Sequence, residues 1–328
     1  MNEQIPISAE LRASVQRRLH PEIQQIAIRD HDQWMRERSQ DFTASVAGCL
    51  FGVHPYTSEY EQHMLKSGQI TADPEETIMQ RQGRLLEPVA IQLLREQRPD
   101  WTVDYPHRIY YRDVAARLGA TPDAPTRDDC GDWGNVQVKV VERWVFKAEW
   151  CDEAGEISPP LSMAIQTIVE AHLIRAKWAA IAVLIVGGGV ELKIVPVPIH
   201  DRLIARVKEK VAAFWEGVRM LTPPNPDYSR DGALIEQLFR GNGEVVDMSG
   251  DNALVALVDE KERLAADAKS AKVRLDEIKA EILDKLSGAS AARIAGGRVI
   301  TAKRVERSGY TVEPYSYVDL RIKNGARK

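Results

Sequence analysis

Cysteine is scarce in this chain of 328 residues, which contains only Cys49, Cys130 and Cys151. Their odd number and wide spacing exclude a disulfide framework and a zinc knuckle, and favour a reduced, cytoplasmic setting. Charge of one sign is not in excess either, because 48 Asp and Glu residues oppose 44 Lys and Arg residues, giving a net charge of -4. Any binding to nucleic acid must therefore depend on a local basic surface.

Long apolar runs are also missing. The longest, residues 178–190, is shorter than the roughly 20 residues that a membrane-spanning helix needs. The first thirty residues are rich in polar and charged side chains and contain no continuous apolar segment of the kind that a signal peptide requires. We therefore expect neither a membrane span nor a signal peptide.

The periodicity of apolar residues predicts an α/β protein. Helical spacing fills most of the first forty residues and recurs after Asp73, in 157–176 and in 199–221. Strand patterns occupy 101–113, 116–120 and 136–141, with a polar turn region at 123–132. Two further strands, 179–186 and 190–197, are joined by three glycines. The expected fold is a mixed central sheet flanked by helices.

A proline-rich linker at 223–226 divides the chain. We expect one domain over 1–228 and an appendage over 229–328. The appendage carries a coiled-coil-like helix at 252–287 and basic strands over 298–322. Its closing cations lie along DNA or form a solvated strand face; they are Lys303, Arg304, Arg307, Arg321, Lys323, Arg327 and Lys328.

Polar groups enter apolar surroundings in three segments. Glu87 lies on the helix after Asp73, and Asp123 ends a strand. Gln137 and Lys139 share one face of the valine-rich strand, because side chains alternate along a strand. Carboxylate and amide oxygens suit Mg²⁺, and hydrolysis of a phosphodiester needs such a cation.

In this hypothesis Glu87 and Asp123 are anionic metal ligands. The Gln137 amide oxygen and the Val138 carbonyl are neutral ligands. Lys139 orients or deprotonates the attacking water, or stabilises the pentavalent phosphate.

Each of these residues alone has a more ordinary explanation. A glutamate on a helix is usually solvated, and an aspartate after proline is usually a turn residue. A Gln-x-Lys segment usually forms the polar face of an edge strand. Three valines, Val136, Val138 and Val140, argue against a wet edge strand here, and a lysine beside them is costly without a partner.

The order of the motifs resembles the YqaJ/lambda-exonuclease family of phage recombination nucleases, within the PD-(D/E)xK superfamily. The resemblance covers roughly residues 34–197. Gln137 stands where the family has a metal-binding Glu, and Ala124 where it has Gly; Mrr-type nucleases of the same superfamily use Q-x-K. The matching positions are Trp34, Arg38, Thr43, Ala44, Ser45, 52–56, Gly83, Glu87, Pro88, 120–123, Gln137, Lys139 and Gln166.

The resemblance implies a restriction-endonuclease-like core, with Lys139, Glu87, Asp123 and Gln137 catalytic and Gln166 closing the site. It implies that Arg38 and Ser45 bind the 5′-phosphate of a DNA end, although Arg38 alone equally fits a solvated surface charge. The implied cofactor is Mg²⁺, with Mn²⁺ possible.

The implied partners are double-stranded DNA ends, a single-strand annealing protein and further copies of the chain, often in a trimeric ring. The implied setting is the cytoplasm of a bacterial or phage-infected cell. The expected activity is a metal-dependent exonuclease that makes single strand for recombination. Two alternatives stay open: a catalytically weak DNA-end-binding module that recruits the annealing protein, and an endonuclease that also cuts closed circular DNA.

Overall fold

The computed structural model describes residues 22–71, 76–105, 108–306, 318 and 320. The chain divides into two compact units, Met1–Leu234 and Ile235–Lys328. Each unit is described by itself.

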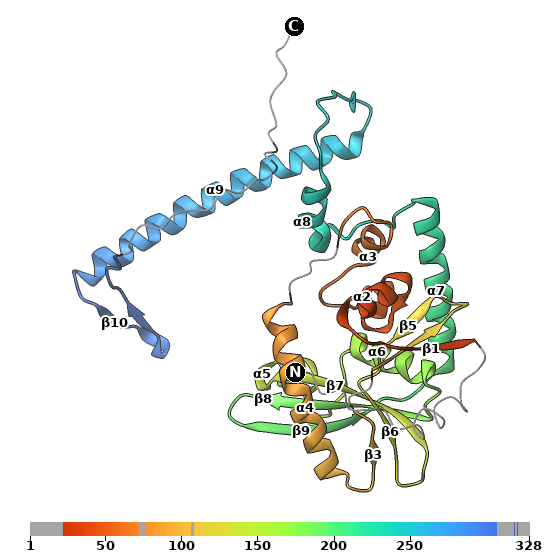
Figure 1. The fold of residues 1–328 in the computed structure, drawn as a ribbon. Helices are drawn as coiled ribbons and strands as arrows, with labels where there is room; N and C mark the ends of the chain where they lie inside the picture. Colours follow the sequence, from red (N-terminus) through yellow and green to blue (C-terminus); the bar gives the residue numbers. More distant parts are fainter. Residues whose placement is uncertain (1–21, 72–75, 106–107, 307–317, 319, 321–328) are drawn as a thin grey trace. The chain divides into compact units, whose positions relative to one another are not determined.

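A five-stranded mixed sheet forms the centre of the first unit (Figure 1). Its long strands β7 and β8 are parallel, with Val138 beside Ala182, and every other pair in this sheet is antiparallel. The β-branched residues of β8 are buried on both faces, which explains the nearly continuous apolar sequence of this strand. The strand order is β3 (Thr102–Val103), β6 (Ala124–Arg127), β7 (Trp133–Glu142), β8 (Trp178–Val186) and β9 (Val190–Pro196).

Helices cover both faces of this sheet. Val136 and Val138 of β7 pack in one apolar cluster with the buried face of α4 (Ile78–Gln97). The alternate side chains of β7 face α6 (Leu161–Leu173), to which Asn135 and Lys139 both hydrogen-bond. The predicted α/β fold, a mixed sheet flanked by helices, is confirmed.

A second, smaller sheet has the order β1 (Ile23–Ala27), β4 (Ile109–Asp113), β5 (Leu118–Ala120) and β2 (Phe42–Thr43). It shares the larger apolar cluster with α6 and with the central sheet. Among the described residues, the other helices of the unit are α2 (His31–Gln40), the 3-10 helix η1 (Ala44–Phe51), α3 (Glu59–Lys66), α5 (Arg143–Glu149), α7 (Asp201–Met220) and α8 (Tyr228–Leu238), whose last four residues belong to the second unit.

Three predicted elements differ from the structure. The amphipathic start of the chain contains β1, which pairs with β4, before helix α2 begins. The single strand predicted over 101–113 is two strands, β3 and β4, in different sheets. The polar region predicted as a turn at 123–132 contains β6, whose first three residues are buried between β3 and β7. Pairing with neighbouring strands outweighs local polarity there.

Helix α4 begins later than its sequence suggested. Thr77 caps it, accepting from the Gln80 N–H, while the Gln80 side chain accepts from the Thr77 N–H in a capping box. Asp73, the expected cap, lies outside the described residues, as do 1–21 of the predicted first helix. Helices α3 and α5 were not predicted, because each is shorter than three turns.

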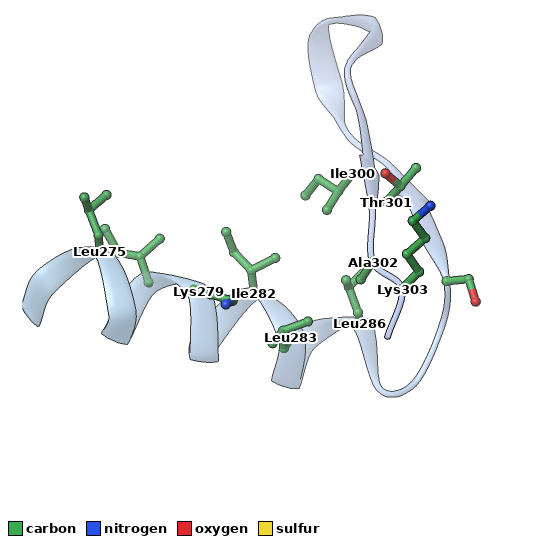
Figure 2. A pocket seen from close by; sticks show the side chains of 11 residues that line it. Leu275, Lys279, Ile282, Leu283, Leu286, Ile300, Thr301, Ala302 and Lys303 are labelled. Carbon is green, nitrogen blue, oxygen red and sulfur yellow. The ribbon is translucent and has the colours of Figure 1, made fainter. Parts of the chain in front are cut away.

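The second unit contains the long helix α9 (Asn252–Leu286), as predicted, and a hairpin of β10 (Ala291–Arg293) and β11 (Val299–Thr301). Figure 2 shows an apolar groove between the end of α9 and this hairpin. Most of the basic residues predicted to close the chain lie outside the described residues: Arg307, Arg321, Lys323, Arg327 and Lys328. Within the described part of the chain, no helix is long and apolar enough to cross a membrane.

Candidate active site

Asp123 lies beside β7, in the position immediately before strand β6, which begins at Ala124. Its Oδ2 accepts hydrogen bonds from Gln137 Nε2 at 2.5 Å and from the Val138 backbone N–H at 2.9 Å. Because β6 pairs with β7 only as far as Val136, the backbone of Val138 is free of β6 and reaches the aspartate instead. Two segments that are distant in sequence thus meet at one carboxylate.

Lys139 begins a chain of hydrogen bonds between β7 and α6. Its Nζ donates to Gln166 Oε1 at 3.0 Å, and Gln166 Nε2 donates to Glu170 Oε1 at 2.8 Å. Glu170 Oε2 accepts from Asn135 Nδ2 at 3.2 Å. Lys139 therefore has the hydrogen-bonding partner that its apolar flanks require, and the half-buried Gln166 is that partner.

Glu87 occupies the buried face of α4. It precedes Ala90, Ile91 and Leu94 by three, four and seven residues, which is the spacing of one helix face, and all three are in contact with the sheet. Burial and the negative charge of Asp123 raise the pKa of Glu87 to about 7, while Lys139 and a hydrogen bond with Tyr105 oppose the shift. Glu87 is thus electrostatically coupled to Asp123 and Lys139 although it comes from another layer.

The site concentrates carboxyl groups. Burial raises the pKa of Asp123 above its ordinary value, against the opposing effects of Lys139, Val138 and Gln137. Burial and the Asp123 charge raise the pKa of Glu170 to about 8. Three carboxyl groups that favour protonation so close to one another form an environment that a bound cation would stabilise.

The residues present fit a hard divalent cation. Gln137 is 3% exposed, and its Oε1 has no hydrogen-bond partner among the described residues, although the same amide head is bonded to Asp123. A strand residue projects its N–H and C=O from the same edge, so the Val138 carbonyl also faces the Asp123 side. Carboxylate, amide and carbonyl oxygens are the donors that Mg²⁺ and Ca²⁺ prefer.

Another acidic group lies elsewhere in the unit. Asp128, Asp129 and Cys130 form the one triple of Asp, Glu, His or Cys residues, among those that the structure describes, whose ligand atoms all lie within 4.8 Å of one another. They occupy the exposed turn between β6 and β7, and Asp128 and Asp129 accept backbone hydrogen bonds within it. This turn lacks the half-buried lysine and the buried amide of the first site.

Arg38 lies in a cluster of aromatic and hydroxyl groups. Its Nη2 donates to Ser45 Oγ at 2.9 Å and to Thr43 Oγ1 at 3.5 Å, and its guanidinium lies 4.3 Å from the centroid of the Trp34 ring. Trp34 Nε1 donates to Thr121 Oγ1 at 3.0 Å, two residues before Asp123. No ion pair between described residues includes Arg38. The alternative of a solvated surface charge is wrong, because the side chain is packed and burial lowers its pKa.

The structure thus brings Asp123, Gln137 and Val138 into direct contact, and joins Lys139 to Gln166. Glu87 is coupled to them through charge, and Arg38 and Ser45 form a neighbouring cluster. Sequence reasoning missed Glu170 and Tyr105. Glu170 could have been identified from the sequence, because it is the one acidic residue of α6 and lies one turn after Gln166. Tyr105 left none beyond its place in an aromatic stretch.

No family model matches the sequence, and no curated protein matches it either. The fold is similar to solved structures of low identity. One is an alkaline exonuclease from Laribacter hongkongensis, 18% identical, with a TM-score of 0.45, covering 62% of this chain and 99% of that one. Another is a phage-related exonuclease from Haemophilus somnus, 15% identical, with a TM-score of 0.43, covering 55% of this chain and 94% of that one.

Proposed function

We propose that this protein is a metal-dependent deoxyribonuclease with a PD-(D/E)xK-type core that digests linear duplex DNA from its ends. The observation that carries the proposal is the meeting of Asp123 with Gln137 and Val138, with Lys139 next on the same face of β7. Oxygen ligands beside a half-buried, hydrogen-bonded lysine are the groups that hydrolysis of a phosphodiester needs.

In this proposal Glu87, Asp123, Gln137 and the Val138 carbonyl hold Mg²⁺, or Mn²⁺ in its place. When bound, the cation neutralises phosphate oxygens and makes a water molecule nucleophilic. Lys139 presents its Nζ to the reacting phosphate from the same face of β7 as Gln137, and Gln166 fixes the direction of that amine. An ammonium held in a partly buried site stabilises the charge that develops on the phosphate.

The Arg38 cluster supports action at DNA ends. A guanidinium that stacks on Trp34 and points at two hydroxyls, without a carboxylate partner among the described residues, suits a terminal 5′-phosphate. We expect Ser45→Ala to slow digestion of 5′-phosphorylated duplex roughly tenfold, because one charge-assisted hydrogen bond is lost. Digestion of the same duplex with a 5′-hydroxyl should change little; an equal loss on both ends would remove Ser45 from the phosphate site.

The central test uses end-labelled linear duplex with Mg²⁺, with Mn²⁺ and with EDTA. We expect nucleotide release with either metal, none with EDTA, and no cutting of closed circular DNA. Asp123→Asn should reduce the rate by at least about a hundredfold, since it removes a metal-ligating charge. Asp129→Asn, in the exposed turn, is the matched control and should digest normally. Loss of activity in the control alone would place the metal at that turn.

One observation favours a second function. Gln137 is neutral, so the first set of proposed ligands contains only two carboxylates, and the site binds its cation less strongly than a three-carboxylate site. An end-binding module that recruits an annealing protein is the alternative. It would bind duplex ends without releasing nucleotides, and Gln137→Glu would then be required for cutting. We also propose that the second unit, with α9, recruits the annealing protein and assembles copies of the chain into a trimeric ring.

A further inference from the structure

Glu170 is a third acidic residue of the site, and it comes from α6 rather than from β7. It is 2% exposed, on a helix whose other buried side chains are mostly apolar. No ion pair between described residues includes it. Burying a carboxylate without a cation is costly, so its presence here needs an explanation beyond packing.

The hydrogen bonds around Glu170 have a fixed direction. Gln166 Oε1 must accept from Lys139, because an amine only donates, so Gln166 Nε2 must face Glu170. Asn135 Nδ2 also donates to the Thr167 carbonyl, which only accepts, so its amide nitrogen is the group that faces Glu170. Both oxygens of Glu170 therefore accept from N–H donors, an arrangement that a carboxylate satisfies and a glutamine does not.

The position of Glu170 relative to β7 follows from the same bonds. Lys139 reaches α6 at Gln166, whereas Asn135 reaches it further along, at the Thr167 carbonyl and at Glu170, one turn after Gln166. The two elements therefore run antiparallel here, and Gln137 lies between the two contact points on the same face of the strand. The charge of Glu170 is felt at Asp123, Lys139 and Arg38.

We propose that Glu170, held in its charged form when a divalent cation is bound nearby, supplies from the helix the negative charge that position 137 lacks on the strand. Both of its oxygens are engaged by Gln166 and Asn135, so it acts as a positioning residue outside the ligand set. It raises the affinity of the site for a divalent cation through its charge and holds Gln166 in the orientation that directs Lys139. This inference rests on the proposed function, because it concerns the cation of that site.

The test is calorimetry with Ca²⁺, a hard cation that binds oxygen ligands, on full-length protein. Glu170→Gln should weaken Ca²⁺ binding about tenfold, the lower end of the usual effect of removing an outer partner of a metal site. Gln137→Glu alone should strengthen binding. The exchanged variant, Gln137→Glu with Glu170→Gln, should return to within about threefold of the wild type. The matched control is Glu142→Gln, an exposed change at the end of β7, which should bind normally.

Rescue by the exchange separates charge from packing, because a purely structural role of Glu170 would not be repaired by a carboxylate on the strand. Unchanged Ca²⁺ affinity in Glu170→Gln would overturn the inference and leave the proposed function intact. Failure of both Glu170→Gln and the exchanged variant to fold, judged by circular dichroism, would assign Glu170 to stability and overturn it too. A wild type that binds no divalent cation would overturn the proposed function together with this inference.

Discussion

At the scale of single residues, the carboxyl groups of the site make the stability of the metal-free protein depend on pH. The pKa of Glu87 is raised to about 7, above its ordinary value of 4.5. Between these values the unfolded chain has released the proton and the folded protein still holds it, so the stability that this group contributes is lost as pH rises through 7. Below pH 4.5 the contribution is fully present.

Glu87→Gln should therefore be similar to the wild type in unfolding free energy at pH 5 and more stable than it at pH 8, when both are measured by urea denaturation in EDTA. The difference should shrink or reverse with Ca²⁺ present, because the cation stabilises the charged form of Glu87 in the wild type. Histidines and other groups titrate in both proteins and cancel in the comparison. A difference that is the same at pH 5 and pH 8 would contradict the electrostatic coupling of Glu87.

The sequence predicts those residues of the site whose position follows from a local pattern, and it does not predict those that are placed by tertiary packing. Gln137 and Lys139 could be placed on one face because strand periodicity is local, and Asp123 stood out after Pro122. The contact between Asp123 and the Val138 N–H depends on where β6 stops pairing with β7, and the sequence around 123–132 looked like a turn. The role of Glu170 depends on the direction of α6 across β7, which no local pattern contains.

At the scale of elements, helix α4 contains an interior glycine that neither its backbone conformation nor its packing requires. Gly83 lies one turn before Glu87, with helical backbone, and a Cβ added there would meet no atom within 4 Å. The fold therefore does not require the absent side chain. In an ordinary helix such a glycine costs about 0.5–1 kcal/mol relative to alanine.

We expect Gly83→Ala to raise the unfolding free energy by about 0.5–1 kcal/mol. If duplex DNA approaches α4 closely at this turn, the same change should raise KM for linear duplex and leave kcat nearly unchanged. The matched control is Gly232→Ala in α8, which also has open space and helical backbone but lies away from Glu87. A stabilised Gly83→Ala protein with unchanged KM would show that DNA does not approach α4 there.

The length of each element explains why the long helices and strands were predicted from the sequence and the short ones were not. The helices α7 and α9 and the strands β7, β8 and β9 extend over enough residues for their period to be clear, and each was expected. β2, β3, α3 and α5 have two to eight residues each, and their structure depends on what they pack against. The second, smaller sheet is built from such short strands, so its topology could not be predicted from the sequence.

At the scale of the whole molecule, helix α9 has apolar side chains that the second unit does not bury. Leu257, Leu264 and Leu275 are 50–66% exposed. The groove in Figure 2 adds further apolar residues from the end of the helix. A helix of 35 residues with an uncovered apolar stripe is typical of a segment that associates with another helix.

A protein that ends after Leu238 should therefore keep its nuclease activity on short duplexes and form a smaller oligomer than the full chain, measured by light scattering after gel filtration. The cut must lie beyond Asp231, because Asp231 is buried and accepts from Ser58 Oγ at 2.5 Å, and from the Asp227 N–H at 2.7 Å. The charge-reversing pair change Arg263→Glu and Asp267→Lys on α9 is the control, since it leaves the apolar stripe intact. Identical particle mass for the truncated and full proteins would refute a role of α9 in assembly.

The anchoring of α8 has a practical consequence for handling the protein. Hydrogen bonds of Arg230 and Asp231 attach the start of this helix to the loop around Ser58. Residues 239–250, which follow the helix, are all exposed. Arg240, at the beginning of that exposed segment, is the first trypsin site after the fastened helix. Contaminating protease in a cell extract would cleave there and release a fragment that keeps every residue of the candidate active site. Loss of α9 by such a cut would change any particle mass that depends on this helix, so mass spectrometry should accompany every measurement of particle size.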